Sequence, residues 1–426
     1  MPFTPSVLHA ADRILGQFGV LNRSLSADAL IEAASHRTGL RDFGDECFID
    51  PLQRLLDSTN RESALSTIGR LATRWDVLRF LSNLLRMRDA EIRDPDVLQE
   101  SVKSPMFITG LPRSGTTFLH RLMMLDPQSR APRVWETIFP YPACPSPDRR
   151  LAQVSRQLKA FERLAPEFRA LHPLEATSPQ ECSEITAHVF RSLRFDTNYR
   201  VPSYRKWLDA DEARSIPGYG FHKRFLQHLQ HRSANKTRRW VLKCPEHVFT
   251  LSTIRKVYPD ARIVFVHRDP VKVLLSVAKL TEVLRRPFTR QIDPEEIGRQ
   301  ESARWLDGTA RMVAAGDDAG FQEPICHVHY MDLVSDPLST LDGVYRHFGL
   351  ALDLETSAAI ERYVAEKPNG GYGPRRYRFE DHGLDPEVER EKFRHYMLKF
   401  GIAAETTPRC GVTKRQELQP VRPLAI

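Results

Sequence analysis

The sequence predicts an α/β fold in which helices cover both faces of a central parallel sheet. The first observation is that short apolar segments, typical of buried strands, alternate with longer helical segments. The second is a glycine-containing loop that joins the first predicted strand to a predicted helix. The third is the composition, because 41% hydrophobic and 27% charged residues among 426 allow a large core and exclude a disordered chain. The predicted strands are residues 105–110, 239–243, 261–267 and 324–330.

Residues 1–103 are predicted to be helical. The segment 26–39 begins with Ser26, a favourable helix N-cap, and ends at Gly39, which favours a helix end. Further along, apolar residues recur at helical spacing with arginines between them, which predicts that this stripe packs in the core. The members of the stripe are Ile68, Leu71, Trp75, Leu78 and Leu85.

The rest of the chain is predicted to form an α/β domain, residues 104–400, followed by an irregular tail, residues 401–426. Within the domain, residues 136–235 form an insert that is predicted to be largely helical. Proline and glycine predict loops at residues 140–150 and 367–383.

Charge and cysteine content exclude several classes of protein. The 62 basic and 54 acidic residues give a net charge of +8, but the two signs are interspersed, so nucleic acid is not an expected partner. The six cysteines form no CxxC pair, which argues against a zinc knuckle, a dithiol redox motif or a disulfide scaffold. Without a run of about 18 apolar residues or a signal-peptide pattern, a cytoplasmic protein with no transmembrane segment is expected.

The loop after the first predicted strand carries the strongest chemical signal. Gly110 and Gly115 frame the loop, and two threonines follow before the predicted helix. Such a loop directs backbone N–H groups at a phosphate, and the helix dipole also favours an anion there. Thr116 stands where the loop of an ATPase carries lysine, and Arg113 supplies positive charge from inside the loop. This pattern disfavours a magnesium-bound triphosphate.

Two further predicted strands end beside cationic residues. Arg268 follows the third predicted strand, and Ser276 lies eight residues further along in a predicted helix, so this pair suits a second phosphate. Lys243 ends the second predicted strand, where lysine can neutralise a departing phosphate oxygen. His247 follows it and is a candidate base near neutral pH.

In this order, the segments resemble the sulfotransferases that use 3′-phosphoadenosine 5′-phosphosulfate. Residues 110–123 resemble the family's 5′-phosphosulfate loop, and residues 264–277 resemble its 3′-phosphate motif. The resemblance covers roughly residues 60–400 and implies a P-loop-NTPase-like three-layer fold with a central parallel sheet. The other similar segments are 132–137, 178–185, 240–243, 329–350 and 370–385.

The resemblance implies a nucleotide site. It places the 5′-phosphosulfate on the glycine loop and the 3′-phosphate on Arg268 and Ser276, with Arg375 or Arg376 as a further contact. The product would be adenosine 3′,5′-bisphosphate, and the family needs no metal. The implied loop residues are Gly110, Pro112, Arg113, Ser114, Gly115, Thr116 and Thr117.

The resemblance also implies in-line transfer of the sulfuryl group to an acceptor hydroxyl or amine that has lost its proton to a base. Arg113, Lys243 and the loop amides would stabilise the charge on the leaving phosphate. His247 is one candidate base, although the family's cytosolic branch has its catalytic histidine closer to the matching lysine. The alternative bases are Glu181 and Glu184, which also suit the first turn of an ordinary helix, and, more weakly, Glu136.

Two other classes of function remain as alternatives. A P-loop small-molecule kinase would need the lysine that Thr116 replaces, and a clear magnesium-binding aspartate at a strand end. A non-enzymatic nucleotide or nucleic-acid binder predicts a broad basic face, whereas these cations follow strand ends. For the favoured enzyme, the acceptor is expected to be a small molecule, and one candidate class is a hydrophobic or lipid alcohol. The helical N-terminal region and the insert are expected to shape its pocket.

Overall fold

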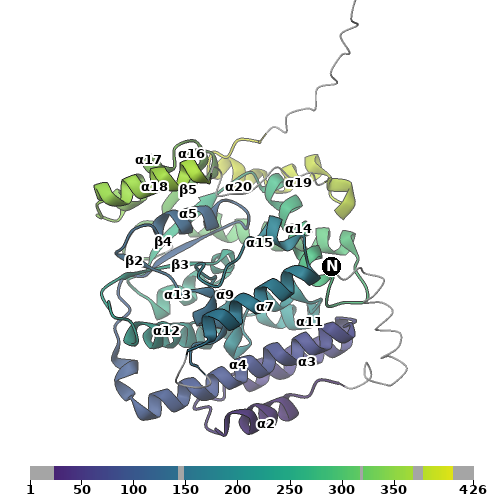
Figure 1. Ribbon diagram of the computed structural model, residues 1–426. Coiled ribbons are helices and arrows are strands. Elements are labelled where there is room, and N and C mark those ends of the chain that lie inside the picture. Colours follow the sequence, from purple (N-terminus) through teal and green to yellow (C-terminus); the bar gives the residue numbers. More distant parts are fainter. Residues whose placement is uncertain (1–23, 143–147, 317–319, 368–377, 406–426) are drawn as a thin grey trace, which may run out of the picture.

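The computed structural model describes residues 24–142, 148–316, 320–367 and 378–405. Its five parallel strands form one sheet in the order β2-β3-β1-β4-β5 (Figure 1). The predicted parallel sheet is therefore confirmed, and the short strand β2, which the sequence did not indicate, adds an edge beside β3. The strands are β1 (Met106–Gly110), β2 (Ser129–Arg130), β3 (Arg239–Lys243), β4 (Arg262–His267) and β5 (Cys326–His329).

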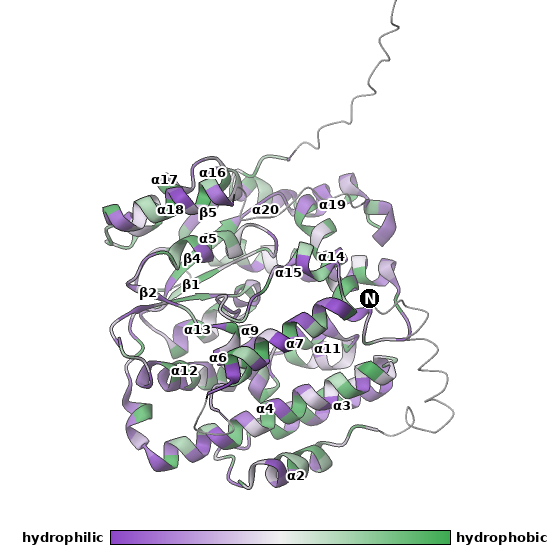
Figure 2. Cartoon of the chain, viewed as in Figure 1, coloured by the Kyte–Doolittle hydropathy of each residue, from purple (hydrophilic) through white to green (hydrophobic). Residues whose placement is uncertain are grey.

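The three central strands β1, β3 and β4 are buried on both faces, which explains why they are mostly apolar runs without polar alternation. Along β1, Phe107 packs into one core cluster, while Met106 and Ile108 pack into a second cluster on the other face. Figure 2 shows the matching green colour along β1 and β4. In Figure 1, α5, α16, α17 and α18 lie on one side of the sheet, and α12 and α13 lie on the other.

The helices before the sheet share its core. Phe80 and Leu85 of α4 belong to the same cluster as Phe107 of β1. Ser26 caps α2 as predicted, because its side chain accepts a hydrogen bond from the N–H of Ala29. The described residues of the N-terminal region contain α2 (Ala27–Thr38), α3 (Ile49–Glu62), α4 (Thr67–Arg93) and the 3₁₀ helix η2 (Pro95–Gln99).

The apolar stripe of α4 divides into two parts, and the prediction that all of it packs in the core is wrong. Leu85 is fully buried and Leu78 packs against the core, but Leu71 is 62% exposed and Trp75 is 39% exposed. Leu71 and Trp75 line a large cavity instead of meeting another element. Helical spacing shows which residues share a face, but it does not show whether a neighbour covers that face.

The described part of residues 136–235 consists largely of short helices. It holds α6 (Val134–Ile138), α7 (Arg150–Leu164), α8 (Phe168–Leu171), α9 (Ser183–Thr186), η3 (Ala187–Val189), α10 (Arg194–Asn198), α11 (Pro202–Asp209), η4 (Glu212–Ser215) and α12 (Ile216–His231).

Further helices connect or follow the strands. They are α5 (Thr116–Met123), η5 (Pro245–Phe249), α13 (Leu251–Val257), α14 (Pro270–Arg285), α15 (Pro294–Ala315), α16 (Tyr330–Ser335), α17 (Pro337–His347), α18 (Leu354–Glu366), η7 (Phe379–His382), α19 (Pro386–Lys392) and α20 (Arg394–Lys399).

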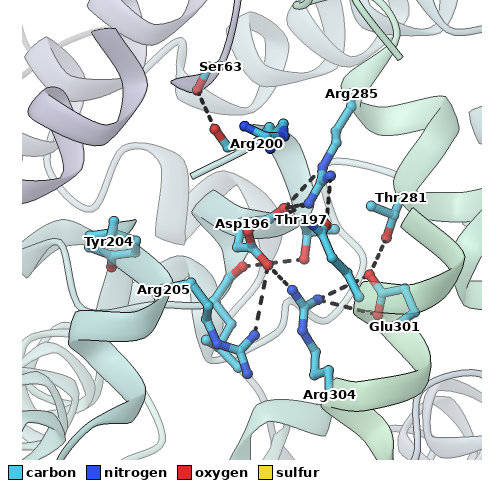
Figure 3. A network of polar contacts seen from close by, with 12 residues as sticks. Ser63, Asp196, Thr197, Arg200, Tyr204, Arg205, Thr281, Arg285, Glu301 and Arg304 are labelled. Atoms are coloured by element: carbon cyan, nitrogen blue, oxygen red, sulfur yellow. Dashed lines mark hydrogen bonds and ion pairs between the residues drawn. The ribbon is translucent and has the colours of Figure 1, made fainter. Parts of the chain in front are cut away.

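A buried ionic network ties the insert to α14 and α15 (Figure 3). The carboxylate of Asp196 pairs with Arg304, lies 3.6 Å from Arg285 and lies 3.8 Å from Arg205. Arg285 also donates to the backbone carbonyl of Asp196 at 2.6 Å. Glu301 accepts from Arg304 at 3.1 Å, so the network contains more cations than carboxylates.

Replacing Asp196 by Asn is expected to destabilise the fold by about 3 kcal/mol, because it leaves buried arginines without their main counter-charge. The measurement is the thermal unfolding midpoint of the two proteins. Asp209→Asn is the matched control, since Asp209 also pairs with Arg205 but lies at the surface. Equal midpoints for Asp196→Asn and Asp209→Asn would contradict the expectation.

Candidate active site

A cavity of about 1210 Å³ opens beside the carboxyl ends of the strands β1, β3 and β4. This edge of an open α/β sheet is where ligands generally bind. One part of the wall comes from the glycine loop and from residues just after β3 and β4. The other part is apolar and comes from α4, α7 and α14.

The glycine loop adopts the backbone that its sequence indicated. Gly110 and Gly115 have φ of 131° and 97°, which side-chain-bearing residues rarely adopt. A Cβ on Gly110 would lie 2.3 Å from the carbonyl oxygen of Val266, so no larger residue fits there. Arg113 also has a positive φ, 63°, and backbone strain of this kind is concentrated at functional sites.

Five of the seven predicted loop residues line the cavity, and two lie behind it. Ser114 is buried and its hydroxyl donates to the carbonyl of Leu111 at 2.6 Å, so it shapes the loop from inside. Gly110 is the last residue of β1 and is also not part of the cavity wall. The five residues at the wall are Pro112, Arg113, Gly115, Thr116 and Thr117.

The two predicted phosphate segments meet at one place. Arg268 donates from Nη1 to the backbone carbonyl of Arg113 at 2.8 Å, and Arg113 donates from Nε to the hydroxyl of Ser276 at 3.2 Å. The guanidinium of Arg268 lies 3.8 Å from the ring centroid of Tyr330. Arg113, Arg268, Ser276 and Tyr330 all line the cavity, so residues far apart in the sequence form one cationic corner.

An acidic residue that the sequence did not single out already contacts this corner. Both oxygens of Glu405 accept from Arg268, from Nε and from Nη2, at 2.8 Å each. The backbone N–H of Glu405 donates to Asp269 at 2.8 Å, which holds the segment in place. Glu405 lies in the part of the chain expected to be irregular, so no sequence pattern pointed to it.

Glu181 and Lys243 form an ion pair next to the glycine loop. Lys243 is buried, pairs with Glu181, and donates to the hydroxyl of Thr117 at 3.2 Å. Burial, the largest single cause, would raise the pKa of Glu181, but the charge and hydrogen bond of Lys243, together with the nearby His172 and His120, lower that pKa below its ordinary value. Glu181 is therefore ionised at neutral pH and can accept a proton.

His172 also lines this part of the cavity, and nothing in its sequence context indicated it. Burial lowers its pKa to about 4, although the charge of Glu181 acts in the opposite direction. Its imidazole is therefore neutral at pH 7. A lone histidine after a short helix has no distinguishing pattern, so only the fold could place it here.

The two other glutamate candidates have partners that occupy them. Glu184 lies at the cavity wall and accepts from Arg79 at 2.7 Å and from Arg194 at 2.8 Å. Glu136 accepts from the backbone N–H of Arg133 at 2.9 Å, as part of the capping box that begins α6. Glu136 is not among the residues that line the cavity.

The structure places His247 in the core. Its side chain is 1% exposed, and its Nδ1 lies 2.5 Å from the hydroxyl of Tyr219. Burial lowers the pKa of His247 well below its ordinary value, and the ring packs against Phe107. His247 does not line the cavity, because its side chain is packed in the core against Phe107 and Tyr219. Arg375 and Arg376 lie outside the described residues.

Glu246, which precedes His247, faces the cavity instead. Its carboxylate accepts from the backbone N–H of Leu193 at 3.1 Å and from the hydroxyl of Ser192 at 3.2 Å. Burial raises the pKa of Glu246 to about 7, and the nearby charge of Glu181 acts in the same direction.

Replacing Glu246 by Gln is expected to stabilise the protein at pH 8 and to change little at pH 5. Folding raises the pKa of this acid, so the wild type loses stability as the pH rises from about 4.5 to about 7, by at most about 3 kcal/mol. The amide removes that loss and still accepts the two hydrogen bonds. The measurement is the unfolding midpoint at both pH values. Exposed Glu175→Gln is the control, and an effect of Glu246→Gln that is independent of pH would contradict the expectation.

Every helix in the described ranges is too short or too polar to span a lipid bilayer. No group of three or more His, Cys, Asp or Glu side chains within these ranges is arranged to hold a metal ion.

Comparison with known proteins identifies the family. A model of the sulfotransferase family matches residues 105–354. The omega-hydroxy-beta-dihydromenaquinone-9 sulfotransferase Stf3 of Mycobacterium bovis is 25% identical over 296 residues, which cover 66% of this chain and 69% of that protein.

Two solved structures have the same fold. The sulfotransferase STF9 of Mycobacterium avium is 26% identical, with a TM-score of 0.80, over 91% of this chain and 99% of that one. STF1 of Mycobacterium tuberculosis H37Rv is 29% identical, with a TM-score of 0.74, over 87% and 99% of the two chains. These likenesses support the P-loop-like fold and disfavour the kinase alternative. Since the family model spans more than half of the chain, this protein belongs to the sulfotransferase family and is a sulfuryl-transferring enzyme.

Proposed function

We propose that the protein transfers a sulfuryl group from 3′-phosphoadenosine 5′-phosphosulfate to the hydroxyl of a lipid or another long apolar alcohol. The observation that carries the proposal is the set of residues that together form the wall of one cavity. Its wall combines a glycine loop, a cationic corner and an apolar surface, with the Glu181–Lys243 pair beside the loop. The loop and the cationic corner suit a nucleotide donor, and the apolar surface suits an apolar acceptor. Glu181 lies where the two would meet and could serve as the base.

The residues present fit the phosphates of this donor. The loop ends at the N-terminus of α5, where backbone N–H groups and the helix dipole favour an anion. A Cβ on Gly115 would lie 2.9 Å from the ring of Tyr330, so the loop is packed too closely for a larger residue. Arg268 and Ser276 would hold the 3′-phosphate, and the loop with Arg113 would hold the 5′-phosphosulfate. For the 3′-phosphate site, Arg375 and Arg376 remain a prediction from the sequence.

The donor supplies an activated sulfuryl group on a phosphate leaving group, and the chain's residues supply proton transfer and charge stabilisation. Glu181 accepts the proton of the acceptor hydroxyl, because it is ionised and lies at the cavity wall. Lys243 and Arg113 stabilise the negative charge that the leaving phosphate oxygen gains. Thr117 orients the ammonium of Lys243 through their hydrogen bond. Buried His247 is not needed for any of these steps.

The acceptor is proposed from the rest of the cavity wall. The remaining wall of the cavity has an apolar surface, which includes Leu158 and Phe161 of α7, Leu280 and Leu284 of α14, and Trp75 of α4. Stf3, which resembles this chain, is named as a sulfotransferase of omega-hydroxy-beta-dihydromenaquinone-9. We therefore assign the insert and the N-terminal helices to acceptor binding. A cytoplasmic location is proposed as well, because the four cysteines among the described residues are free thiols.

Calorimetry with adenosine 3′,5′-bisphosphate tests the donor site, and we expect saturable binding by the wild-type protein without added metal. A transfer assay with labelled donor then compares long-chain alcohols, short alcohols, phenols and amines, and we expect long-chain alcohols to be favoured. Absence of nucleotide binding would overturn the proposed donor. Transfer only to small polar acceptors would overturn the proposed acceptor class and leave the donor intact.

A further inference from the structure

The exposed half of the α4 stripe lies at the opening of the cavity. Leu71 and Trp75 line the cavity and are also 62% and 39% exposed to solvent, which places them at its mouth. The guanidinium of Arg79 lies 5.3 Å from the ring centroid of Trp75, so the ring is supported from the protein side. A leucine and a tryptophan at a cavity mouth form an apolar entrance that water solvates poorly.

Exposed cations lie on α4 and α7, the helices that carry the entrance and part of the cavity wall. Arg74 on α4 is exposed, and so are Arg156, Lys159 and Arg163 on α7. None of these four pairs with a carboxylate in the described part of the chain. The three cations on α7 alternate along the sequence with cavity-lining residues such as Leu158 and Phe161. Figure 1 shows α7 running above α4, and Figure 2 shows hydrophobic and hydrophilic residues side by side on both helices.

Acidic side chains on the same face do not cancel this charge. Glu162 is the one acidic residue of α7, and it is half-buried. Glu167, just beyond the helix, pairs with Arg286 at 2.8 Å. Asp76 of α4 is buried and pairs with Arg79 and Arg194. The solvent-exposed sides of α4 and α7 therefore carry a net positive charge.

We propose that this entrance, formed by Leu71 and Trp75 with the cations of α4 and α7, docks on a bilayer that contains anionic lipids. Tryptophan favours the interface between headgroups and acyl chains, and leucine favours the acyl side. Arginine and lysine can reach the phosphates of anionic headgroups while their stems cover apolar surface. Docking in this orientation would let an apolar acceptor pass from the bilayer into the cavity without crossing water. The inference rests on the proposed lipid acceptor and adds where that acceptor is collected.

Vesicle flotation of the full-length protein tests the docking. We expect the wild type to float with vesicles of equal parts phosphatidylglycerol and phosphatidylcholine, and to float weakly with phosphatidylcholine alone. The double variant Leu71→Ser with Trp75→Ser is expected to lose binding about tenfold, because the two side chains supply the inserted apolar area. The control is the double variant Leu354→Ser with Leu398→Ser, whose side chains are 90% and 69% exposed on α18 and α20, away from the cavity. Its binding should equal that of the wild type.

A charge-reversal arm separates docking on anionic lipid from non-specific adhesion. The charge-reversal variant combines Arg156→Glu, Lys159→Glu and Arg163→Glu. We expect it to bind the mixed vesicles more weakly, by about fivefold for each residue changed. Its weak binding to phosphatidylcholine vesicles should not change. Raising the salt concentration should weaken wild-type binding in the same direction. Unfolding midpoints report whether each variant is folded.

Three results would overturn the inference. They are absence of wild-type binding to the anionic vesicles, unchanged binding by the Leu71 and Trp75 double variant, and equal loss in the Leu354 and Leu398 control. Calorimetry with adenosine 3′,5′-bisphosphate on the same preparations reports on the donor site independently. A protein that binds the nucleotide but no vesicle would refute the docking face and leave the proposed donor standing. If the enzyme took up lipid only from a carrier protein, the partner that docks on this entrance would be that carrier and not a bilayer.

Discussion

Replacing Glu181 by Gln is expected to lower kcat by about 10²- to 10⁴-fold, the range that a positioned general base contributes. Glu181 pairs with Lys243 at the cavity wall, and Lys243 in turn contacts Thr117 of the glycine loop. The amide has a similar size but cannot take the proton of the acceptor hydroxyl. Because Lys243 lowers the pKa of Glu181, we also expect wild-type kcat to hold down to pH values below the usual range for a glutamate and to fall as the carboxylate protonates.

Steady-state kinetics with saturating donor and acceptor provide the measurement. Glu175→Gln is the matched control, because Glu175 lies on the same segment but is exposed and outside the cavity wall. Calorimetry should show that Glu181→Gln still binds adenosine 3′,5′-bisphosphate within a few-fold of the wild type, which separates loss of the base from loss of the site. Full turnover in Glu181→Gln, with loss in His247→Gln at an unchanged unfolding midpoint, would assign the base to His247 instead.

Replacing Arg268 by Ala is expected to weaken binding of adenosine 3′,5′-bisphosphate by about 10- to 100-fold, as expected for hydrogen bonds to a charged group. The same change removes the hydrogen bond that fixes the carbonyl of Arg113, so the loop loses support as well. Arg262→Ala is the control. Arg262 begins the same strand, β4, at the edge away from the site and pairs with Glu323. Equal affinities for Arg268→Ala and the wild type would remove Arg268 from the nucleotide site.

Glu405→Gln is expected to act in the opposite direction. Both oxygens of Glu405 contact the guanidinium that we assign to the 3′-phosphate, so the ion pair has to open before a phosphate can take its place. Neutralising Glu405 weakens that competitor, and the affinity for adenosine 3′,5′-bisphosphate should increase by up to about tenfold. Calorimetry on both proteins measures the change. Weaker binding by Glu405→Gln would mean that Glu405 positions Arg268 and does not compete with the phosphate.

The strands and the glycine loop could be predicted because their determinants are local. Met106 to Gly110 form a short apolar run that ends in glycine, and such a run specifies a buried strand and a tight turn without help from distant residues. The cationic residues at the strand ends were predictable for a related reason. Parallel strands place their carboxyl ends at one edge of a sheet, so Arg113, Lys243 and Arg268 had to lie near each other.

The partners of those residues could not be predicted, because the contacts join segments that are distant in the sequence. Glu181 and Lys243 are 62 residues apart, and Arg268 and Glu405 are 137 apart. Nor could local sequence distinguish Glu246, which faces the cavity, from His247, which is buried in the core. The direction of each side chain in a short 3₁₀ turn depends on what packs around it.

The fold class, the glycine loop and the edge of the sheet at which the cavity opens could be inferred from the sequence alone. Only the folded chain shows which carboxylate meets the lysine, which acid contacts Arg268, and which half of the α4 stripe stays exposed. One physical cause explains all of these cases. Periodicity and turn residues encode local backbone geometry, whereas burial and charge pairing depend on which distant element covers a face, as Leu85 in the core and Leu71 at the cavity mouth illustrate.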